Sequence, residues 1–151
     1  ELLIVMSREE DDRARKLHDR ARHAAGVRIV HAGSDPLAAL PLLAHLKQRG
    51  VVAMKLDRTA PGMRCREVQF CGEAWRIPEG ILTLAAVSGA PILPVFTRRL
   101  GFLDYEYVSS PALRLPRRPS PSELDVAAQT LADRFAGFVR ASPDQWFSWD
   151  A

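Results

Sequence analysis

Residues 46–57 read Leu-Lys-Gln-Arg-Gly-Val-Val-Ala-Met-Lys-Leu-Asp, and this stretch decides the fold. The residues up to Arg49 are typical of the end of a helix, and Gly50 is the kind of residue that stops one. Residues 51–56 form an apolar run typical of a buried strand, which ends at Asp57. The order helix, glycine, strand predicts a layered protein in which helices cover a sheet.

The same alternation extends in both directions from this stretch. Strands are expected at residues 2–6, 27–30, 51–56, 64–75 (one strand or a bent hairpin arm), 91–96 and 105–108. Helices are expected at residues 9–25, 34–49, 81–88 and from Ser122 onward. Pro41 should kink the second helix or mark a late start. The pattern predicts one α/β domain over residues 1–151, with layered αβα architecture and a largely parallel central sheet.

Composition excludes several classes of protein. The chain has 151 residues, of which 47% are hydrophobic and 26% charged, as in globular domains rather than disordered chains. The formal net charge of +3 is not concentrated in a basic run, so nucleic acid is not expected as a partner. No uninterrupted apolar run reaches about 18 residues, which predicts no membrane-spanning helix in this sequence. Cys65 and Cys71 lack the spacing of a metal pair and are expected to be free thiols.

Motifs for common cofactors are also absent. No glycine-rich loop of the dinucleotide or P-loop kind occurs, and no Gly-x-Ser-x-Gly elbow is present. His18 and His23 are five residues apart, which does not suit a metal pair on one helix face. His31 and Asp35 could form a polar pair at a strand end, although a strand-end loop histidine without special function is the default interpretation. We therefore expect neither a metal nor a cofactor.

The ends of the expected strands carry a more informative set of residues. In open α/β sheets, ligands bind beyond the carboxyl ends of the strands. Arginines are suited to bidentate contacts with phosphate or carboxylate groups. These strand ends carry Arg8, His31, Asp57-Arg58 and Arg98-Arg99. Either they form an anion-binding rim or the arginines are ordinary solvated surface residues.

Six segments of the sequence resemble a known family. They are residues 4–9, 46–57, 68–74, 77–85, 89–99 and 143–149. In this order they resemble the C-terminal portion of the late lipid A acyltransferases, the lauroyl and myristoyl branch of the lysophospholipid acyltransferase superfamily. The resemblance covers nearly the whole chain, although each segment alone is modest.

The resemblance implies transfer of a fatty acyl group from an acyl-thioester donor, acyl carrier protein or coenzyme A, to a hydroxyl of a lipid or glycolipid acceptor. The family's general base is the His of a His-x-x-x-x-Asp or Glu element, in which the carboxylate orients the imidazole. None of the four histidines here has an acidic residue five positions later. The chain therefore looks like a fragment of a longer acyltransferase, and we expect these residues alone to be inactive.

The resemblance also implies substrate-binding roles. It assigns them to Arg8, Asp57, Arg58, Glu79, Gly80, Arg98 and Arg99. Arg8 is expected to hold anionic groups, Glu79 and Gly80 to lie at the acceptor side, and Arg98-Arg99 to bind a phosphorylated head group. No residue of the chain is expected to be the catalytic base.

Two further expectations concern the surroundings of the protein. The full-length protein is expected at the cytoplasmic face of the bacterial inner membrane, held there by an N-terminal segment that this sequence lacks. Trp146 and Trp149 either form a membrane-interface pair or pack under the last helix. A non-catalytic α/β module that binds a phosphorylated lipid head group or a partner protein is the alternative function.

Overall fold

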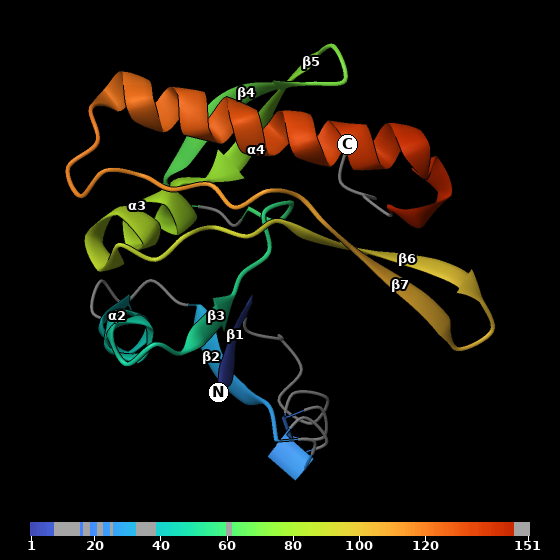
Figure 1. Cartoon of the computed structure of the whole chain (residues 1–151), viewed down its shortest axis with the longest axis horizontal. Helices are drawn as coiled ribbons and strands as arrows, with labels where there is room; N and C mark the ends of the chain where they lie inside the picture. Colours follow the sequence, from blue (N-terminus) through green and yellow to red (C-terminus); the bar gives the residue numbers. More distant parts are fainter. Residues whose placement is uncertain are drawn as a thin grey trace. The chain divides into compact units, whose positions relative to one another are not determined.

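A computed structural model of the chain describes residues 1–7, 16, 19–20, 23–24, 26–32, 39–59 and 62–146. They belong to two compact units, Glu1–Arg58 and Thr59–Ala151 (Figure 1). Helices and strands occur in both units, which confirms the α/β class. The single domain expected over residues 1–151 stays a prediction.

The first unit is built on a three-stranded parallel sheet with strand order β2-β1-β3. Its elements are β1 (Leu2–Ser7), β2 (Arg28–Ala32), α2 (Ala39–Lys47) and β3 (Val51–Ala53). The apolar run at the start of the chain takes the central position, where Leu3 is buried between its neighbours. The expected third strand is shorter than predicted. Most of the helix expected over residues 9–25 lies outside the described residues.

The end of α2 corrects one prediction about glycine. The residue with a left-handed backbone is Arg49, with φ of 62°, and not Gly50. Gly50 is required for space instead, because a Cβ there would lie 2.3 Å from His45 Nε2. The buried His45 ring donates from Nε2 to the carbonyl oxygen of Glu1 at 3.1 Å and so ties α2 to the start of β1.

We therefore expect Gly50→Ala to lower the free energy of unfolding by about 2 kcal/mol, the usual scale of overpacking. Thermal or urea unfolding followed by far-UV circular dichroism measures the loss. In a His45→Ala background the same substitution should cost much less, because the ring that the new methyl group meets is gone. Equal costs in the two backgrounds would show that Gly50 is not there for space.

The second unit contains two antiparallel hairpins and two helices. Its elements are β4 (Cys65–Phe70), β5 (Glu73–Pro78), α3 (Glu79–Ser88), β6 (Val95–Gly101), β7 (Asp104–Ser109), α4 (Pro121–Ala141) and the 3-10 turn η2 (Pro143–Gln145). The strands pair as β4-β5 and β6-β7. Short two-residue connections allow only antiparallel pairing, so the parallel sheet of this chain lies in the first unit.

The β4-β5 hairpin settles the alternative left open for residues 64–75. Cys71 and Gly72 both have positive φ, at 53° and 96°, which matches the two-residue turn that fits the twist of a hairpin. Cys65 lies on β4 and Cys71 in the turn, and both are free thiols as expected.

Helix α4 carries the apolar stripe that the sequence predicts. Its fully buried side chains include Ala128 and Leu131, and it packs along β4 (Figure 1). The Gln129 amide accepts from the backbone N–H of Gln69 and donates to its carbonyl, both at 2.9 Å, so it covers part of the open edge of β4.

The start of α4 differs from the prediction. The N-cap is Ser120 and not Ser122, and Pro121 occupies the first turn. Ser120 Oγ accepts from the N–H of Glu123, whose carboxylate accepts from the N–H of Ser120 at 2.7 Å. This reciprocal capping box lowers the pKa of Glu123 below its ordinary value.

Six aromatic rings pack together in part of the core of the second unit. They are Phe70, Trp75, Phe96, Phe135, Phe138 and Trp146. Phe135 is the centre, with ring centroids of four of the others within 6 Å. Trp146 meets Phe135 edge to face at 5.2 Å, so it packs against the last helix. Trp149 lies outside the described residues.

Candidate functional site

The seven residues expected to bind substrate fall in different parts of the chain. Asp57 and Arg58 follow β3 in the first unit, with Arg58 Nε 3.8 Å from Asp57 Oδ2. Glu79 and Gly80 begin α3 in the second unit. Arg8 lies outside the described residues. Substrate binding by these residues remains a prediction.

The expected position of Arg98 and Arg99 is wrong. They lie inside β6 rather than at the carboxyl end of a parallel strand. The predicted strand ended before the arginines. The observed strand begins at Val95, four residues later than predicted, and continues past both arginines. Ile92, near the start of the predicted strand, makes only an isolated bridge with Leu113. Arg98 is paired with Glu106 across the hairpin.

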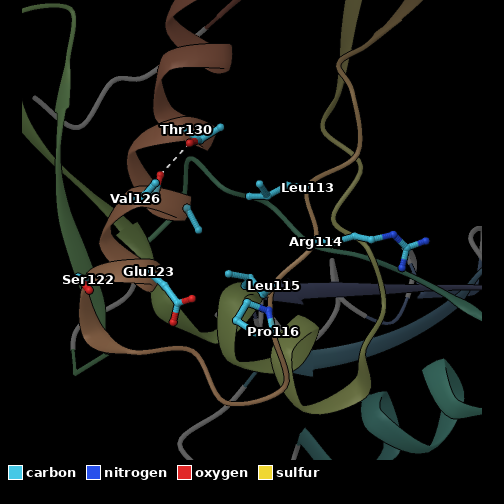
Figure 2. Close-up of a pocket in the computed structure, with 9 residues that line it drawn as sticks. Leu113, Arg114, Leu115, Pro116, Ser122, Glu123, Val126 and Thr130 are labelled. Atoms are coloured by element: carbon cyan, nitrogen blue, oxygen red, sulfur yellow. Dashed lines mark hydrogen bonds between the residues drawn. The ribbon is translucent and has the colours of Figure 1, made fainter.

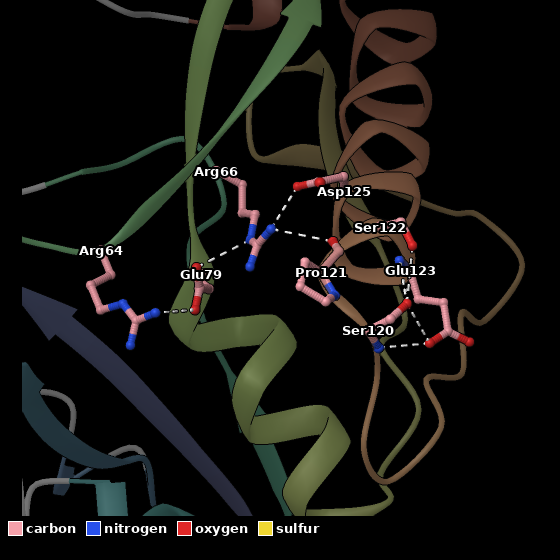
Figure 3. A network of polar contacts seen from close by, with 8 residues as sticks. All are labelled: Arg64, Arg66, Glu79, Ser120, Pro121, Ser122, Glu123 and Asp125. Atoms are coloured by element: carbon pink, nitrogen blue, oxygen red, sulfur yellow. Dashed lines mark hydrogen bonds and ion pairs between the residues drawn. The ribbon is translucent and has the colours of Figure 1, made fainter.

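Among the predicted site residues, Glu79 is the one whose carboxylate is held by two arginines. Its carboxylate is only 13% exposed and contacts two arginines of the β4 side, Arg64 Nη2 and Arg66 Nε, each at 3.1 Å (Figure 3). The position follows directly from the chain path, since β5 ends at Pro78 and α3 begins at Glu79. The backbone N–H of Glu79 also donates to the carbonyl oxygen of Arg64 at 3.0 Å.

Arg66 joins three elements through one side chain. From β4 it contacts Glu79 on α3, Asp125 on α4 at 2.6 Å and the carbonyl oxygen of Pro121 at 3.3 Å (Figure 3). The hydrogen bond to Asp125 is the main cause that raises the pKa of Arg66 above its ordinary value. We call Arg64, Arg66, Glu79 and Asp125 the Glu79 cluster.

The two arginines of the cluster are suited to different tasks. Arg66 is 18% exposed and holds two carboxylates, so it fixes geometry. Arg64 is 84% exposed and touches Glu79 through one nitrogen, which leaves most of its guanidinium open to solvent. An exposed guanidinium beside a fixed carboxylate can hold an anion through the one and a hydroxyl through the other.

Gly80 adds open space next to this cluster. It is exposed within the first turn of α3, and a Cβ placed on it would meet nothing within 4 Å. Neither packing nor backbone conformation in the described residues requires glycine here, and glycine weakens a helix relative to alanine.

Arg64, Arg66 and Asp125 were missed as site residues at the sequence level. One signal was available, because residues two apart on a strand point to the same face, which places Arg64 and Arg66 together. Asp125 gave no comparable signal, since it lies 59 positions after Arg66 in the sequence and meets it only in the folded chain.

A shallow groove with a volume of about 310 Å³ lies between α4 and the segment before it (Figure 2). It is lined by Leu113, Arg114, Leu115, Pro116, Ser122, Glu123, Val126, Ala127 and Thr130. Its walls are mainly apolar, which suits a short hydrocarbon segment better than a sugar.

Among the described histidines, His31 and His45 are not accessible as general bases, whereas His23 is exposed. His31 Nε2 is bound to Asp19 Oδ2 at 3.1 Å, while its Nδ1 is buried, so an acceptor hydroxyl cannot reach it. Asp35, the partner considered from the sequence, lies outside the described residues. His45 is buried against Gly50.

Among the described residues, no helix combines the length and apolar character needed to cross a bilayer. The same residues contain no group of three or more His, Cys, Asp or Glu side chains arranged to hold a metal ion.

Comparison with known proteins agrees with the motif order. Two curated relatives are phosphatidylinositol mannoside acyltransferases from two strains of Mycobacterium tuberculosis. The protein of strain CDC 1551 / Oshkosh is 37% identical over 113 residues, which cover 70% of this chain and 31% of the relative. The protein of strain H37Rv is 38% identical over 109 residues, which cover 67% and 30%.

The chain thus spans about a third of the length of these relatives. A broader match extends over residues 4–149, to the family described as bacterial lipid A biosynthesis acyltransferase. This match begins within β1 and includes Trp146 near its other end. The chain belongs to the bacterial lipid A biosynthesis acyltransferase family.

Proposed function

We propose that this chain is part of an enzyme that transfers a fatty acyl group from an acyl thioester to a hydroxyl group of a glycolipid. The observation that carries the proposal is the match of residues 4–149 to one acyltransferase family. The similarity to phosphatidylinositol mannoside acyltransferases supports a glycosylated lipid as acceptor. The proposed donor is acyl carrier protein or coenzyme A that carries the fatty acyl group. The proposed site of action is the cytoplasmic face of the inner membrane.

In the proposed reaction, a general base takes the proton of the acceptor hydroxyl while its oxygen attacks the thioester carbonyl carbon. A carbon–oxygen bond forms, the carbon–sulfur bond breaks and the donor leaves as a thiol. The proposal takes the base to be the histidine of a His-x-x-x-x-Asp element in a part of the protein outside these 151 residues.

Within this chain, the proposal gives the acceptor to the Glu79 cluster. Arg64 contacts a phosphate of the lipid, Glu79 accepts from a sugar hydroxyl, and Gly80 leaves room for the head group. Arg66 positions Glu79 and does not itself touch substrate. The support is that Glu79 is held in place on both oxygens while Arg64 and Gly80 beside it are exposed.

The transfer is tested on the protein expressed from its complete gene. Palmitoyl coenzyme A and palmitoyl acyl carrier protein are offered with phosphatidylinositol mannoside or a tetra-acylated lipid A precursor, and products are identified by mass spectrometry. A new acyl ester on either acceptor supports the proposal. Binding of the phosphorylated lipids without turnover, in the presence of both donors, favours the alternative of a non-catalytic head-group module. The 151 residues alone are expected to show no turnover.

Gly80→Ala tests the acceptor site separately from folding. Stability should stay level or rise by up to about 1 kcal/mol, because alanine is the better helix residue. Acyl transfer should fall at least tenfold, mainly through a higher KM for the glycolipid. Gly137→Ala is the matched control, since it is also an exposed helix glycine with nothing within 4 Å. Unchanged KM in the Gly80 variant would remove Gly80 from the acceptor site.

A further inference from the structure

The tip of the β6-β7 hairpin exposes large apolar side chains. Phe102 is 85% exposed, Leu103 75% and Leu100 58%. Figure 1 shows the hairpin as a long ribbon whose tip lies away from the other elements of the second unit. Soluble proteins rarely gather such residues at one exposed place, and an apolar group of this kind marks an interaction surface.

The residues of the turn are unusual for a β-hairpin. Leu103 has φ of 57°, a left-handed conformation that favours glycine or asparagine and is uncommon for a bulky residue. Hairpin turns normally also carry polar residues. This turn combines backbone strain with exposed apolar surface. Both features are unfavourable for folding, and such features are expected where a surface has a function.

The two faces of the hairpin differ in character. The pairing register places Arg99 opposite Tyr105, and Thr97 opposite Tyr107, on one exposed face. Arg98 and Glu106 form their ion pair on the other face. Arg99 is the one charged residue on the tyrosine face, and it has no acidic partner among the described residues, so that face is cationic.

The base of the hairpin is fixed while the tip is free. Phe96 stacks on Phe135 and Phe138 of α4, with ring centroids 5.9 and 4.9 Å away. The N–H of Arg99 donates to Gln145 Oε1 at 2.9 Å. The ribbon therefore holds its tip at a set distance from the core.

We propose that this tip inserts into a bilayer of anionic phospholipids. Leu100, Phe102 and Leu103 enter the acyl boundary, while Tyr105 and Tyr107 lie at head-group level, where amphipathic rings are favoured. Arg99 contacts lipid phosphates. Asp104 alone lies between Leu103 and Tyr105, so Tyr105 is two positions, roughly 7 Å, behind Leu103, which matches the roughly 5–10 Å depth of interfacial insertion.

Charge and shape together favour a bilayer over a second protein as the occupant. Phe102 and Leu103, which are 85% and 75% exposed, lie at the tip, and Arg99 and the tyrosine hydroxyls follow behind it, in the order in which a bilayer presents hydrocarbon and then phosphate. The inference rests on the hairpin and is independent of the proposed acyl transfer, because vesicle binding can be measured without turnover.

Vesicle flotation of the protein tests the proposal. We expect binding to vesicles of phosphatidylcholine and phosphatidylglycerol in a 3:1 ratio, and at least tenfold weaker binding after the double substitution Phe102→Ser with Leu103→Asn. Asparagine tolerates the left-handed backbone, so the melting temperature of this variant should not fall. Leu93→Ser is the matched control, because Leu93 is 56% exposed but lies outside the hairpin, and it should bind as the parent does.

The role of Arg99 has its own readout. Arg99→Gln should lower binding to the anionic vesicles severalfold and leave binding to pure phosphatidylcholine unchanged, whereas added salt should reduce the difference. Absence of vesicle binding by the parent protein, or equal binding by the double variant, would overturn the proposal. So would a dimer that sedimentation velocity shows to dissociate in the double variant while vesicle binding persists.

Discussion

Phe135→Ala is expected to lower the free energy of unfolding of the second unit by about 4 kcal/mol, the range found when a buried phenylalanine is truncated. Phe135 is 7% exposed, and its ring lies within 6 Å of four other aromatic rings. Those rings come from β4, β5, β6 and the segment after η2. One truncation therefore removes a ring contact with each of these four segments.

Urea unfolding followed by tryptophan fluorescence measures the effect. The three tryptophans of the chain fall within the second unit, so this signal reports that unit. Phe138→Ala is the matched control, because Phe138 is half-buried and its ring stacks on Phe96 at 4.9 Å. We expect it to cost less than half as much. Similar losses for the two variants would show that Phe135 is not the centre of the core.

Local features of the fold were predictable because they depend on neighbouring residues. The apolar stripe of α4 repeats with the helical period, so the helix was evident from the sequence. Its true start was readable as well, since Ser120-Pro121-Ser122-Glu123 has the Ser-x-x-Glu spacing of a capping box with proline in the first turn. A helix start at Ser122 is inconsistent with that spacing.

Other features depend on parts of the chain that meet only in the fold. Gly50 was expected to end a helix by its backbone freedom, but it is needed because the His45 ring lies against it. Arg98 and Arg99 were expected at a strand end, but pairing with β7 extends the strand through them. Glu79 was assigned by family resemblance alone, and no local pattern indicated that Arg66 would hold it.

Arg66→Ala is expected to lower the free energy of unfolding by about 3 kcal/mol. Removing one partner of a buried ion pair costs about 3–5 kcal/mol, and the lower end applies here because the contact with Glu79 is part-buried and Asp125 is exposed. Glu79 would keep only its contact with the exposed Arg64, in a position where water replaces the lost donor poorly. Arg66→Lys should restore little, since one ammonium group cannot reach both carboxylates with the geometry of a guanidinium.

Arg64→Ala is the matched control for this prediction, because it removes the other arginine from the same carboxylate. Arg64 is 84% exposed, and surface ion pairs contribute about 1 kcal/mol or less. A double-mutant cycle of Arg66→Ala with Glu79→Gln should give a coupling free energy of at least about 1 kcal/mol, since each side chain then matters less once the other is gone. Additive losses, or equal costs for the two arginines, would mean that Arg66 does not position Glu79. Coupling to Glu79 combined with a small loss for Arg64 would leave Arg64 available to contact an acceptor phosphate.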